Sequence, residues 1–432
     1  MRELVIWMNG ERVGRWSVGT AGNHRFQYDQ EWLANPRVRQ ISLSLPCISG
    51  PVTGDKVRNY FDNLLPDAEG IRRRIGSRHK IKNIDAFNLL QAIGRDCVGA
   101  VQLLPAGLEP TGWNKLQYEP MLEAQVEQHI NRLGDEMGTE GADVEDDFRL
   151  SIAGAQEKTA LLKVGDQWCR PLGATPTTHI LKPPIGITPG RNLDMRQSVE
   201  NEWLCNRILH ELKLPAANCE IADFGSKRVL VIERFDRQTT EQGWIARLPQ
   251  EDLCQSKGVA STAKYEQQGG PGIAECLDIL RGGENFQRDG RTFLCAQLLF
   301  WFLGAIDGHA KNFSIFLLPQ GRYRLAPLYD VLSAWPLFGG THGLQYKKVK
   351  LAMSVRATSA HYRLAEIQRR HWEQLAMESG VDDAWSAMLD LAQRLGPALN
   401  AVEGRLPVGF PVEMAQKVFI GARQHLARFN QI

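Results

Sequence analysis

Short apolar segments near the start of the chain are separated by turn-forming residues, a pattern typical of β-strands joined by tight turns. Val5-Ile6-Trp7 and Val13-Gly14-Arg15-Trp16 flank Asn9-Gly10, a dipeptide that favours a two-residue turn between antiparallel strands. Residues 60–74 instead have the spacing of an amphipathic helix, which Pro66 must break or restart because proline removes a backbone donor. The first hundred residues are therefore predicted to mix strands and helices.

The middle of the chain consists of short apolar segments, whereas its last third has helical spacing. We predict strands in residues 159–162, 167–169, 178–182 and 228–233. A helix is predicted over residues 198–212, with Ser198 as its N-cap. From about residue 272 onward helical spacing dominates, and the exceptions are the strand-like residues 313–318 and 323–325. A β-rich part is thus expected to precede a helical part.

The acidic stretch of residues 135–147 is typical of a solvated linker and indicates a boundary between domains. We expect an N-terminal α+β subdomain with this linker in residues 1–145. A β-rich lobe is expected in residues 146–235, and a mostly helical lobe in residues 236–432. This order of lobes is that of a protein-kinase-like bilobal fold.

Composition narrows the class of protein without identifying its function. With 43% hydrophobic and 23% charged residues, the 432-residue chain has the composition of a globular protein. A formal net charge of +2 gives no argument for nucleic-acid binding. The strongest apolar run, residues 298–306, is far shorter than the roughly 20 residues of a membrane-spanning helix. The eight cysteines include no Cys-x-x-Cys pair, so we expect free thiols in a cytoplasmic protein with no membrane partner.

Two motifs in the second half of the chain have the spacing of a phosphotransferase site. Asp307 and Asn312 are five positions apart, like the catalytic aspartate and the magnesium-binding asparagine of protein kinases. Asp330 follows a short predicted hairpin, in the place of the second magnesium-binding aspartate. Each motif has a plain structural alternative, a polar turn for the first and a helix N-cap for the second. Because the two motifs occur in the same order as in kinases, the kinase interpretation is favoured over these structural alternatives.

Three further segments suit nucleotide binding. Residues 151–158 form a small-residue loop whose backbone N–H groups can approach phosphate oxygens, although an ordinary hairpin loop has the same composition. Lys182 ends a predicted strand, from which a lysine reaches the α- and β-phosphates in kinases, although solvated strand-end lysines are commoner. Residues 233–235 lie where the β-rich lobe passes to the helical one, and backbone groups at such a hinge can pair with adenine.

Taken together, these segments resemble the HipA family of bacterial serine/threonine kinases, the toxin halves of toxin–antitoxin pairs. The resemblance extends over almost the whole chain. Its ordered blocks are Trp7-Met8-Asn9, Phe61–Asp67, Ile93–Asp96, Val98–Val101, Ala153–Lys158, Arg247–Asp252 and Asp307–Asn312. The phosphate loop has only Gly154 where other protein kinases have several glycines, and this departure is habitual in the family.

The resemblance implies an α+β kinase fold with an extra HipA-type N-terminal subdomain. It also implies ATP and Mg²⁺ as ligands, with Asp307 as catalytic base and with Asn312 and Asp330 as metal ligands. The ATP-binding residues that it implies are Ala153, Gly154, Ala155, Gln156, Glu157, Lys158, Lys182, Glu233, Arg234, Phe235, His309, Ala310, Lys311, Asn312, Tyr329 and Asp330. Ser151 corresponds to the serine that family members autophosphorylate. A phosphate there would expel the adjacent loop by repulsion and inactivate the enzyme.

The resemblance implies partners as well. The family's targets are proteins of the translation apparatus, and an aminoacyl-tRNA synthetase of the glutamyl type is the expected substrate. A small helix-turn-helix antitoxin, HipB, would neutralise the toxin. The two proteins together would repress their own operon, with operator DNA contacted mainly through the antitoxin.

Two other functions stay open on the residues alone. One is a small-molecule phosphotransferase, such as an aminoglycoside or lipid kinase, whose catalytic core would look alike. The other is a catalytically inactive binding module that serves as a co-repressor. The presence of Lys182, Asp307, Asn312 and Asp330 argues against the inactive module, because the catalytic set is complete.

Overall fold

The computed structural model describes residues 1–133, 150–154, 156–188, 190, 192–340 and 342–431, so the predicted acidic linker lies outside it. The chain forms two compact units, each assembled from separate segments. The first unit comprises Met1–Pro183, Ala222–Thr262 and Ile315–Tyr323. The second comprises Pro184–Ile221, Ala263–Ser314 and Arg324–Ile432.

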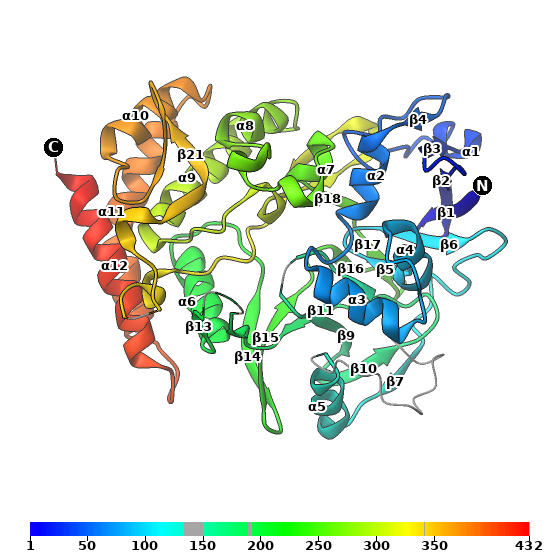
Figure 1. Cartoon of the computed structure of the whole chain (residues 1–432), viewed down its shortest axis with the longest axis horizontal. Coiled ribbons are helices and arrows are strands. Elements are labelled where there is room, and N and C mark those ends of the chain that lie inside the picture. The colour runs from blue at the N-terminus through cyan, green and yellow to red at the C-terminus, as the bar shows by residue number, and fades with distance from the viewer. Residues whose placement is uncertain (134–149, 155, 189, 191, 341, 432) are drawn as a thin grey trace. The chain divides into compact units, whose positions relative to one another are not determined.

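The first unit begins with a five-stranded antiparallel sheet in the order β4-β3-β2-β1-β6 (Figure 1). Asn9 and Gly10 join the first two strands with φ angles of 46° and 82°, which asparagine and glycine adopt at the lowest cost. The predicted hairpin is therefore confirmed. The strands are β1 Arg2–Met8, β2 Glu11–Val18, β3 His24–Tyr28, β4 Val52–Thr53 and β6 Val101–Pro105.

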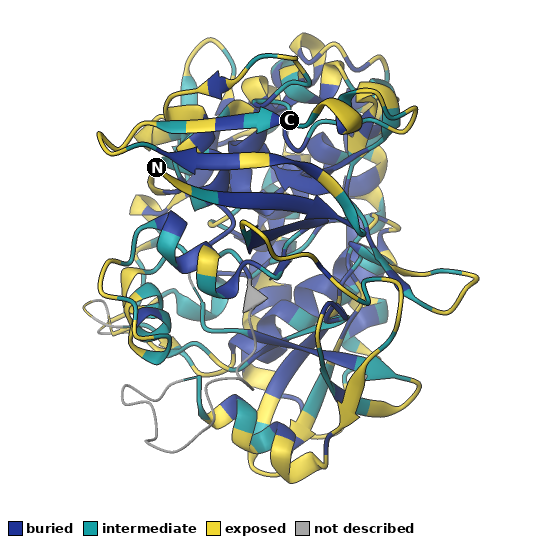
Figure 2. Ribbon diagram, turned by 90° about the vertical axis from the view of Figure 1, so that its right-hand side faces the viewer, coloured by how far each residue is buried: buried dark blue, intermediate teal, exposed yellow. Residues whose placement is uncertain are grey.

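Helices pack on this sheet and complete the first hydrophobic core. Trp16 of β2 stacks on Phe61 with ring centroids 4.1 Å apart, and both side chains are fully buried. Burial of each such side chain stabilises the fold by roughly 1.5–3 kcal/mol. In Figure 2 the long strands of this sheet carry mostly the colour of buried residues. The helices are α1 Gln30–Leu33, α2 Asp55–Asp62, α3 Glu69–Arg78 and α4 Ala86–Ile93, and the break between α2 and α3 includes Pro66, as predicted.

A six-stranded sheet in the order β14-β15-β11-β9-β10-β7 contains the four strands predicted for the middle of the chain. Helix α5, Glu123–Asn131, packs on this sheet, because Val126 and Ile130 lie in one buried cluster with Leu161 and Leu181. The strands are β7 Tyr118–Pro120, β9 Thr159–Val164, β10 Gln167–Pro171, β11 His179–Lys182, β14 Cys219–Phe224 and β15 Lys227–Glu233.

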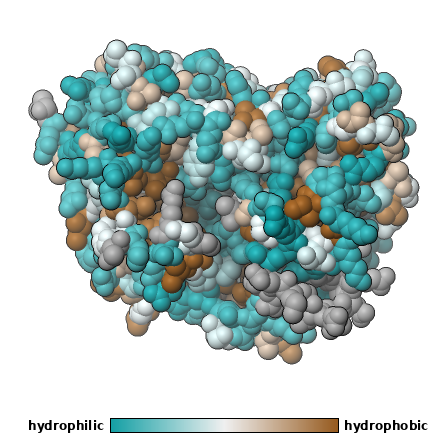
Figure 3. Space-filling view, in the orientation of Figure 1, coloured by the Kyte–Doolittle hydropathy of each residue, from teal (hydrophilic) through white to brown (hydrophobic). Residues whose placement is uncertain are grey.

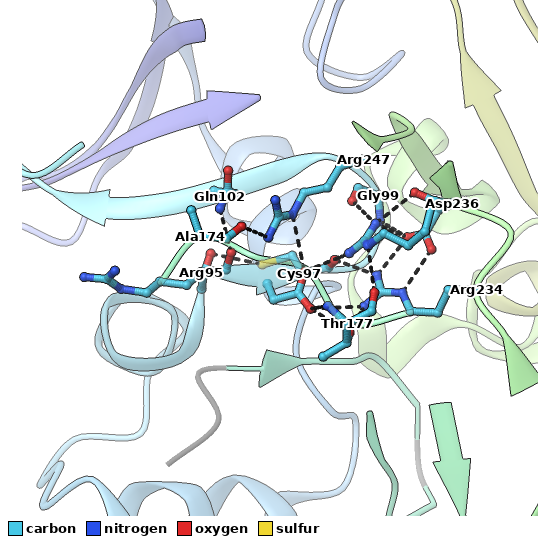
Figure 4. A network of polar contacts seen from close by, with 12 residues as sticks. Arg95, Cys97, Gly99, Gln102, Ala174, Thr177, Arg234, Asp236 and Arg247 are labelled. Carbon is cyan, nitrogen blue, oxygen red and sulfur yellow. Dashed lines mark hydrogen bonds and ion pairs between the residues drawn. The ribbon is translucent and has the colours of Figure 1, made fainter. Parts of the chain in front are cut away.

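Buried charges converge on Asp96 of the short strand β5, Asp96–Cys97. Figure 4 labels Arg234, Asp236 and Arg247 of this network. Its carboxylate accepts hydrogen bonds from Arg237 at 2.8 Å and from the hydroxyl of Thr177 at 2.7 Å. Nε of Arg247 lies 3.4 Å from the same carboxylate. Since Arg237 opens β16 (Arg237–Thr239) and Arg247 ends β17 (Ile245–Arg247), this one carboxylate ties β5 to two neighbouring strands that lie 141 and 151 positions later in the chain at these arginines.

A second buried acid, Asp236, extends the network. It pairs with Arg234 at 2.8 Å and accepts the backbone N–H of Gly99 at 2.7 Å. Gly99 has a φ of 75°, and a Cβ there would lie 2.7 Å from the carbonyl oxygen of Gln250. The backbone can reach Asp236 only because residue 99 is glycine.

The arginines determine the charge state of Asp96. Burial alone would raise its pKa, but the charges of Arg237, Arg234 and Arg247 outweigh burial and hold the pKa well below its usual range. Asp96 is therefore ionised in the folded protein. A buried ion network of this kind tolerates the loss of one partner poorly, because an uncompensated charge stays behind.

The second unit is mostly helical. Helix α9 is buried over most of its length, and its Trp301 stacks on His425 of α12 with ring centroids 4.4 Å apart. Figure 1 shows α11 and α12 side by side, and both pack on α9. The long helices are α6 Ser198–Glu211, α8 Ile273–Arg281, α9 Phe286–Leu303, α10 Arg369–Glu378, α11 Ala384–Glu403 and α12 Val412–Asn430.

Two local predictions in this unit are wrong. Ser198 is not the N-cap of α6: Gln197 holds that position, and the Ser198 hydroxyl accepts the backbone N–H of Ile185 at 2.9 Å instead. The region after residue 272 also contains an unpredicted antiparallel pair, β21 Lys350–Arg356 and β22 Ala360–Arg363. Five consecutive residues of β21 are buried, so it lacks the alternation of apolar and polar residues that indicates a strand.

The shorter elements complete the two units. They are β8 Leu150–Ser151, β12 Gly186–Ile187, β13 Asp194–Met195, β18 Gln250–Asp252, α7 Leu253–Lys257, β19 Ser314–Leu317 and β20 Tyr323–Leu325. Strands β19 and β20 confirm the two strand-like exceptions predicted in the helical region.

The cysteines are free, as predicted. All eight cysteines are free, and all but Cys47 are buried. In the part of the chain that the structure describes, no helix is both long enough and apolar enough to cross a membrane. Figure 3 shows hydrophilic side chains over most of the face in view, with smaller hydrophobic patches among them.

Glu251 is a fully buried acid in β18. Burial raises its pKa to about 8, although the N–H of Leu43 and hydrogen bonds from Ser42 and Ser256 favour the ionised form. Glu251 therefore holds a proton in the folded protein near neutral pH.

Replacing Asp96 with asparagine is expected to lower the free energy of unfolding by about 3–5 kcal/mol, because three buried guanidinium groups would share a single carboxylate. Denaturant-induced unfolding of the purified chain measures the change. Asp223→Asn is a matched control, since it removes an exposed ion pair with Arg228 and should cost less than about 1 kcal/mol. Similar small losses in both variants would contradict a central role for Asp96.

Replacing Glu251 with glutamine should alter how stability depends on pH. The folded pKa of about 8 exceeds the ordinary 4.5, so the contribution of Glu251 is complete below the lower value and is lost as pH rises through the higher one. Relative to Glu251→Gln, the wild type should lose up to about 1.4 kcal/mol of unfolding free energy per pH unit in this window. Unfolding at a series of pH values tests this, with exposed Glu31→Gln as control. A pH-independent difference would rule it out.

Candidate active site

The loop after α9 presents Asp307 to solvent on a backbone that is held in place. Helix α9 ends at Gly304 in the left-handed conformation. The side-chain amide of Asn312 donates to the carbonyl oxygen of Asp307 at 2.9 Å, and the N–H of His309 donates to the same oxygen at 2.8 Å. The side chain of Asp307 is 63% exposed, whereas His309 and Asn312 are buried. The two residues predicted as base and metal ligand are therefore in contact, and the carboxylate is accessible.

Tyr329 links the Asp330 segment to this loop. Its hydroxyl donates to the carbonyl oxygen of Lys311 at 2.9 Å and lies 2.7 Å from the hydroxyl oxygen of Ser314. Asp330 has a φ of 61°, in the left-handed region that residues other than glycine rarely occupy outside turns and functional sites. The predicted metal ligands Asn312 and Asp330 thus follow directly after two residues that are hydrogen-bonded to each other.

The oxygen atoms of these two residues suit Mg²⁺, which prefers oxygen ligands and is commonly held by one or two side chains together with phosphate groups. The amide nitrogen of Asn312 is engaged with Asp307, which leaves its side-chain oxygen as the atom that can bind a cation. Among the described residues, no group of three or more His, Cys, Asp or Glu could hold a metal ion. A cation held by Asn312 and Asp330 alone would need further ligands, such as phosphate oxygens or water.

The small-residue loop lies in the first unit, between β8 and β9. Gly154 has a φ of 118°, and the ammonium of Lys158 donates to the carbonyl oxygen of Ala153 at 2.9 Å. Lys158 thereby closes the loop upon itself. Ala155 and the side chain of Ser151 lie outside the described part of the chain.

Lys182 and the loop lie close together within the first unit. Lys182 ends β11, where it pairs with Leu230 of β15, and its side chain is buried. The side-chain amide of Gln156 donates to the carbonyl oxygen of Pro183, the next residue, at 2.7 Å. Two of the segments predicted to contact phosphate are therefore joined by a hydrogen bond.

The segment predicted as a hinge has a structural role that the sequence did not reveal. Glu233 pairs with His179 at the end of β15, and the N–H of Arg234 donates to the carbonyl oxygen of Thr178 at 2.8 Å. The side chain of Arg234 belongs to the buried charge network around Asp96. Contact between residues 233–235 and ATP stays a prediction.

A pocket of about 90 Å³ adjoins the loop in the first unit. Burial, and then the charges of Arg170, Arg78 and Arg132, lower the pKa of His129 to about 4, so its imidazole is neutral near pH 7. The pocket is electropositive and suits an anionic group. Its charged and titratable lining residues are Arg74, Arg78, His79, His129, Arg132, Lys158 and Glu157.

Sequence reasoning missed Tyr265. Its hydroxyl donates to Oδ1 of Asp307 at 2.5 Å, although the two residues are 42 positions apart. The segment around Tyr265 carries no motif that would indicate this contact, which arises from the fold of the second unit.

Two sequence profiles of one family match the chain. The HipA-like C-terminal domain matches residues 150–399, and the HipA N-terminal domain matches residues 4–104.

Comparisons with individual relatives and with a solved structure indicate the same family. The putative kinase Y4mE of Sinorhizobium fredii is 33% identical over 388 residues, which cover 88% of this chain and 86% of the relative. The serine/threonine-protein kinase toxin HipA of Shewanella oneidensis is 30% identical over 329 residues, covering 73% and 71%. The solved HipA chain from the Shewanella oneidensis MR-1 complex of HipA, HipB and operator DNA superposes with a TM-score of 0.79 at 23% identity, covering 99% of this chain and 98% of that one. The predicted α+β, kinase-like fold is therefore confirmed.

Proposed function

The chain belongs to the HipA family of serine/threonine kinases, and we propose that it is an ATP- and Mg²⁺-dependent protein kinase acting as the toxin of a toxin–antitoxin pair. One observation carries the proposal. The exposed carboxylate of Asp307 stands on a loop held by Asn312, and Tyr329 hydrogen-bonds the Asp330 segment to that loop. A base beside the attacking hydroxyl and a metal-binding pair next to it are what phosphoryl transfer requires.

Asp307 is proposed to be the catalytic base. The hydroxyl of a substrate serine donates to its carboxylate, and the proton passes to Asp307 as the serine oxygen attacks the γ-phosphorus of ATP. The bond between the γ-phosphorus and the β–γ bridging oxygen breaks, and ADP leaves with the electron pair. High exposure of the carboxylate supports this role, since a protein substrate must reach it.

Asn312 and Asp330 are proposed to hold Mg²⁺, which neutralises charge on the transferring phosphoryl group when it is bound. The fixed amide of Asn312 supports this assignment, and so does the left-handed backbone of Asp330. Strained backbone at a polar residue is common where the side chain must point in one required direction.

Nucleotide binding is proposed for the small-residue loop and for Lys182. The positive φ of Gly154 and the hydrogen bond from Gln156 to the residue after Lys182 support a phosphate-binding role for the first unit. The other proposed ATP contacts are Ala153, Ala155, Glu157, Lys158, Glu233, Arg234, Phe235, His309, Ala310, Lys311 and Tyr329.

Autophosphorylation of Ser151 is proposed as the means of inactivation. Ser151 pairs through its backbone with Cys97 and lies three residues before Gly154. A phosphate of nearly two negative charges there would repel ATP from the loop.

The partners are proposed from the relatives, and the substrate from the family resemblance alone. One relative is a HipA toxin, and the solved HipA assembles with HipB and operator DNA. A HipB-type antitoxin that carries the DNA contact, and a translation protein such as glutamyl-tRNA synthetase as substrate, follow for this chain as proposals.

Asp307→Asn should lower kcat for phosphate transfer by about 10²- to 10⁴-fold, because the amide cannot accept the proton. The assay measures labelled phosphate moving from ATP to protein in a cell extract, with identification of the labelled residues. Asp278→Asn, on an exposed acid of α8, should leave the rate unchanged. Label that enters only small molecules would favour the small-molecule kinase, and an equally active Asn variant would exclude Asp307 as base.

Gly154→Ala should weaken ATP binding by about tenfold, since an added Cβ would collide with the Lys158 ammonium and the φ of 118° suits only glycine. Titration with a fluorescent ATP analogue measures the dissociation constant. Gly165→Ala is the matched control, because residue 165 also has a positive φ but its Cβ would meet nothing within 4 Å. Equal affinities in the two variants would argue against a phosphate-binding loop.

A further inference from the structure

The carboxylate of Asp307 is held by a residue outside its own loop. Tyr265 donates its phenolic hydrogen to Oδ1 at 2.5 Å. Within the described chain, no other hydrogen bond reaches this carboxylate. Nε2 of His309 lies 4.0 Å from Oδ2, which is beyond hydrogen-bonding distance. Oδ1 is thus occupied and Oδ2 is accessible.

The position of Tyr265 is itself fixed by its neighbours in the chain. Glu266 accepts the backbone N–H of Ser354 at 2.5 Å and the Ser354 hydroxyl at 2.8 Å, which anchors the segment to β21. Gln267 accepts the ammonium of Lys350, also in β21, at 3.1 Å. A strand within the second unit therefore holds the phenol in place.

The ring of Tyr265 also contacts the catalytic loop. It meets the imidazole of His309 edge to face, with centroids 5.1 Å apart. His309 is buried and donates its backbone N–H to the carbonyl oxygen of Asp307. Tyr265 thus touches the loop at two points, the ring of His309 and the carboxylate of Asp307.

An exposed carboxylate needs such a contact if it is to act as a base. With 63% of its side chain exposed, Asp307 would otherwise rotate about χ1 and χ2 among several rotamers. A general base works only when one of its oxygens lies within hydrogen-bonding distance of the proton to be removed. Holding Oδ1 restricts the carboxylate to an arrangement in which Oδ2 is free to accept.

We propose that Tyr265 is a positioning residue for phosphoryl transfer, whose hydroxyl holds Oδ1 of Asp307 so that Oδ2 receives the proton of the substrate hydroxyl. This inference rests on the proposed kinase function. Tyr265 keeps its own proton throughout. The substrate proton moves to Oδ2 as the serine oxygen bonds to phosphorus and ADP departs.

The same contact has an opposite interpretation, in which the phenol occupies the place of the substrate hydroxyl and blocks it. The two interpretations predict opposite effects of removing the hydroxyl. A positioning residue raises kcat by its presence, whereas a blocking residue lowers activity. Kinetics of Tyr265→Phe therefore decide between them, since the variant keeps the ring and its contact with His309.

The experiment compares initial rates of labelled phosphate transfer from ATP to protein of a heat-treated extract, with ATP concentration varied. Tyr265→Phe should lower kcat by about 10- to 100-fold and leave KM for ATP within about twofold, because a misplaced base slows chemistry without weakening nucleotide binding. Tyr118→Phe, on an exposed tyrosine of β7, should match the wild type. Melting temperatures of all three proteins ensure that every rate is measured on folded protein.

An unchanged or increased kcat in folded Tyr265→Phe overturns the proposal, and an increase indicates the blocking role. A rise in KM for ATP with unchanged kcat also overturns it. The activity of the wild type distinguishes a failure of the proposed role of Tyr265 from a failure of the proposed kinase function. If the wild type transfers no phosphate, the kinase function itself fails, whereas an active wild type with an equally active Phe variant contradicts Tyr265 alone.

Discussion

A single buried carboxylate organises the first unit. Asp96 is surrounded by three guanidinium groups, and none of these charges could be buried without the others. Arg234 and Arg237 each donate to the carbonyl oxygen of Cys97 as well, so the network also satisfies the backbone of β5. Charge-assisted hydrogen bonds of this kind offset the free energy needed to remove the charged groups from water. The network therefore connects β5 to Arg234, which follows β15, and to the strands β16 and β17.

In the second unit, the carboxylate of Asp307 has a different environment from that of Asp96. There the charged group stays in solvent, and what is buried is its support: the amide of Asn312, the ring of His309 and the body of α9. An accessible carboxylate can meet a protein substrate, but it lacks the rigidity that burial confers. The hydrogen bond from Tyr265 supplies orientation without removing the group from water. Two acids of the same chain thus have opposite environments, which match the structural role of Asp96 and the catalytic role proposed for Asp307.

Local chemistry made much of this predictable from sequence. Asn9-Gly10 determines a hairpin, Pro66 interrupts a helix, and the spacing of Asp307 and Asn312 reflects a loop that closes on itself within six residues. Long-range contacts were not predictable in this way. Arg234 was interpreted as part of a hinge, and only the fold places its guanidinium near Asp96, 138 positions away. Ser198 has the side chain of a good N-cap, yet the N–H of Ile185 uses its hydroxyl.

The discontinuous first unit constrains how the protein can be made. Its last segment, Ile315–Tyr323, contributes the ring of Phe316 against Phe235, and Gln320 donates its N–H to Val38. A ribosome releases the chain from its N-terminus, and domains usually fold as they emerge. The charge network around Asp96 can form only after Arg234, Arg237 and Arg247 have been synthesised. Completion of the first unit therefore requires the chain to be made as far as Tyr323, and a product that ends before Arg234 would lack both the neutralising arginines and the Asp307 loop.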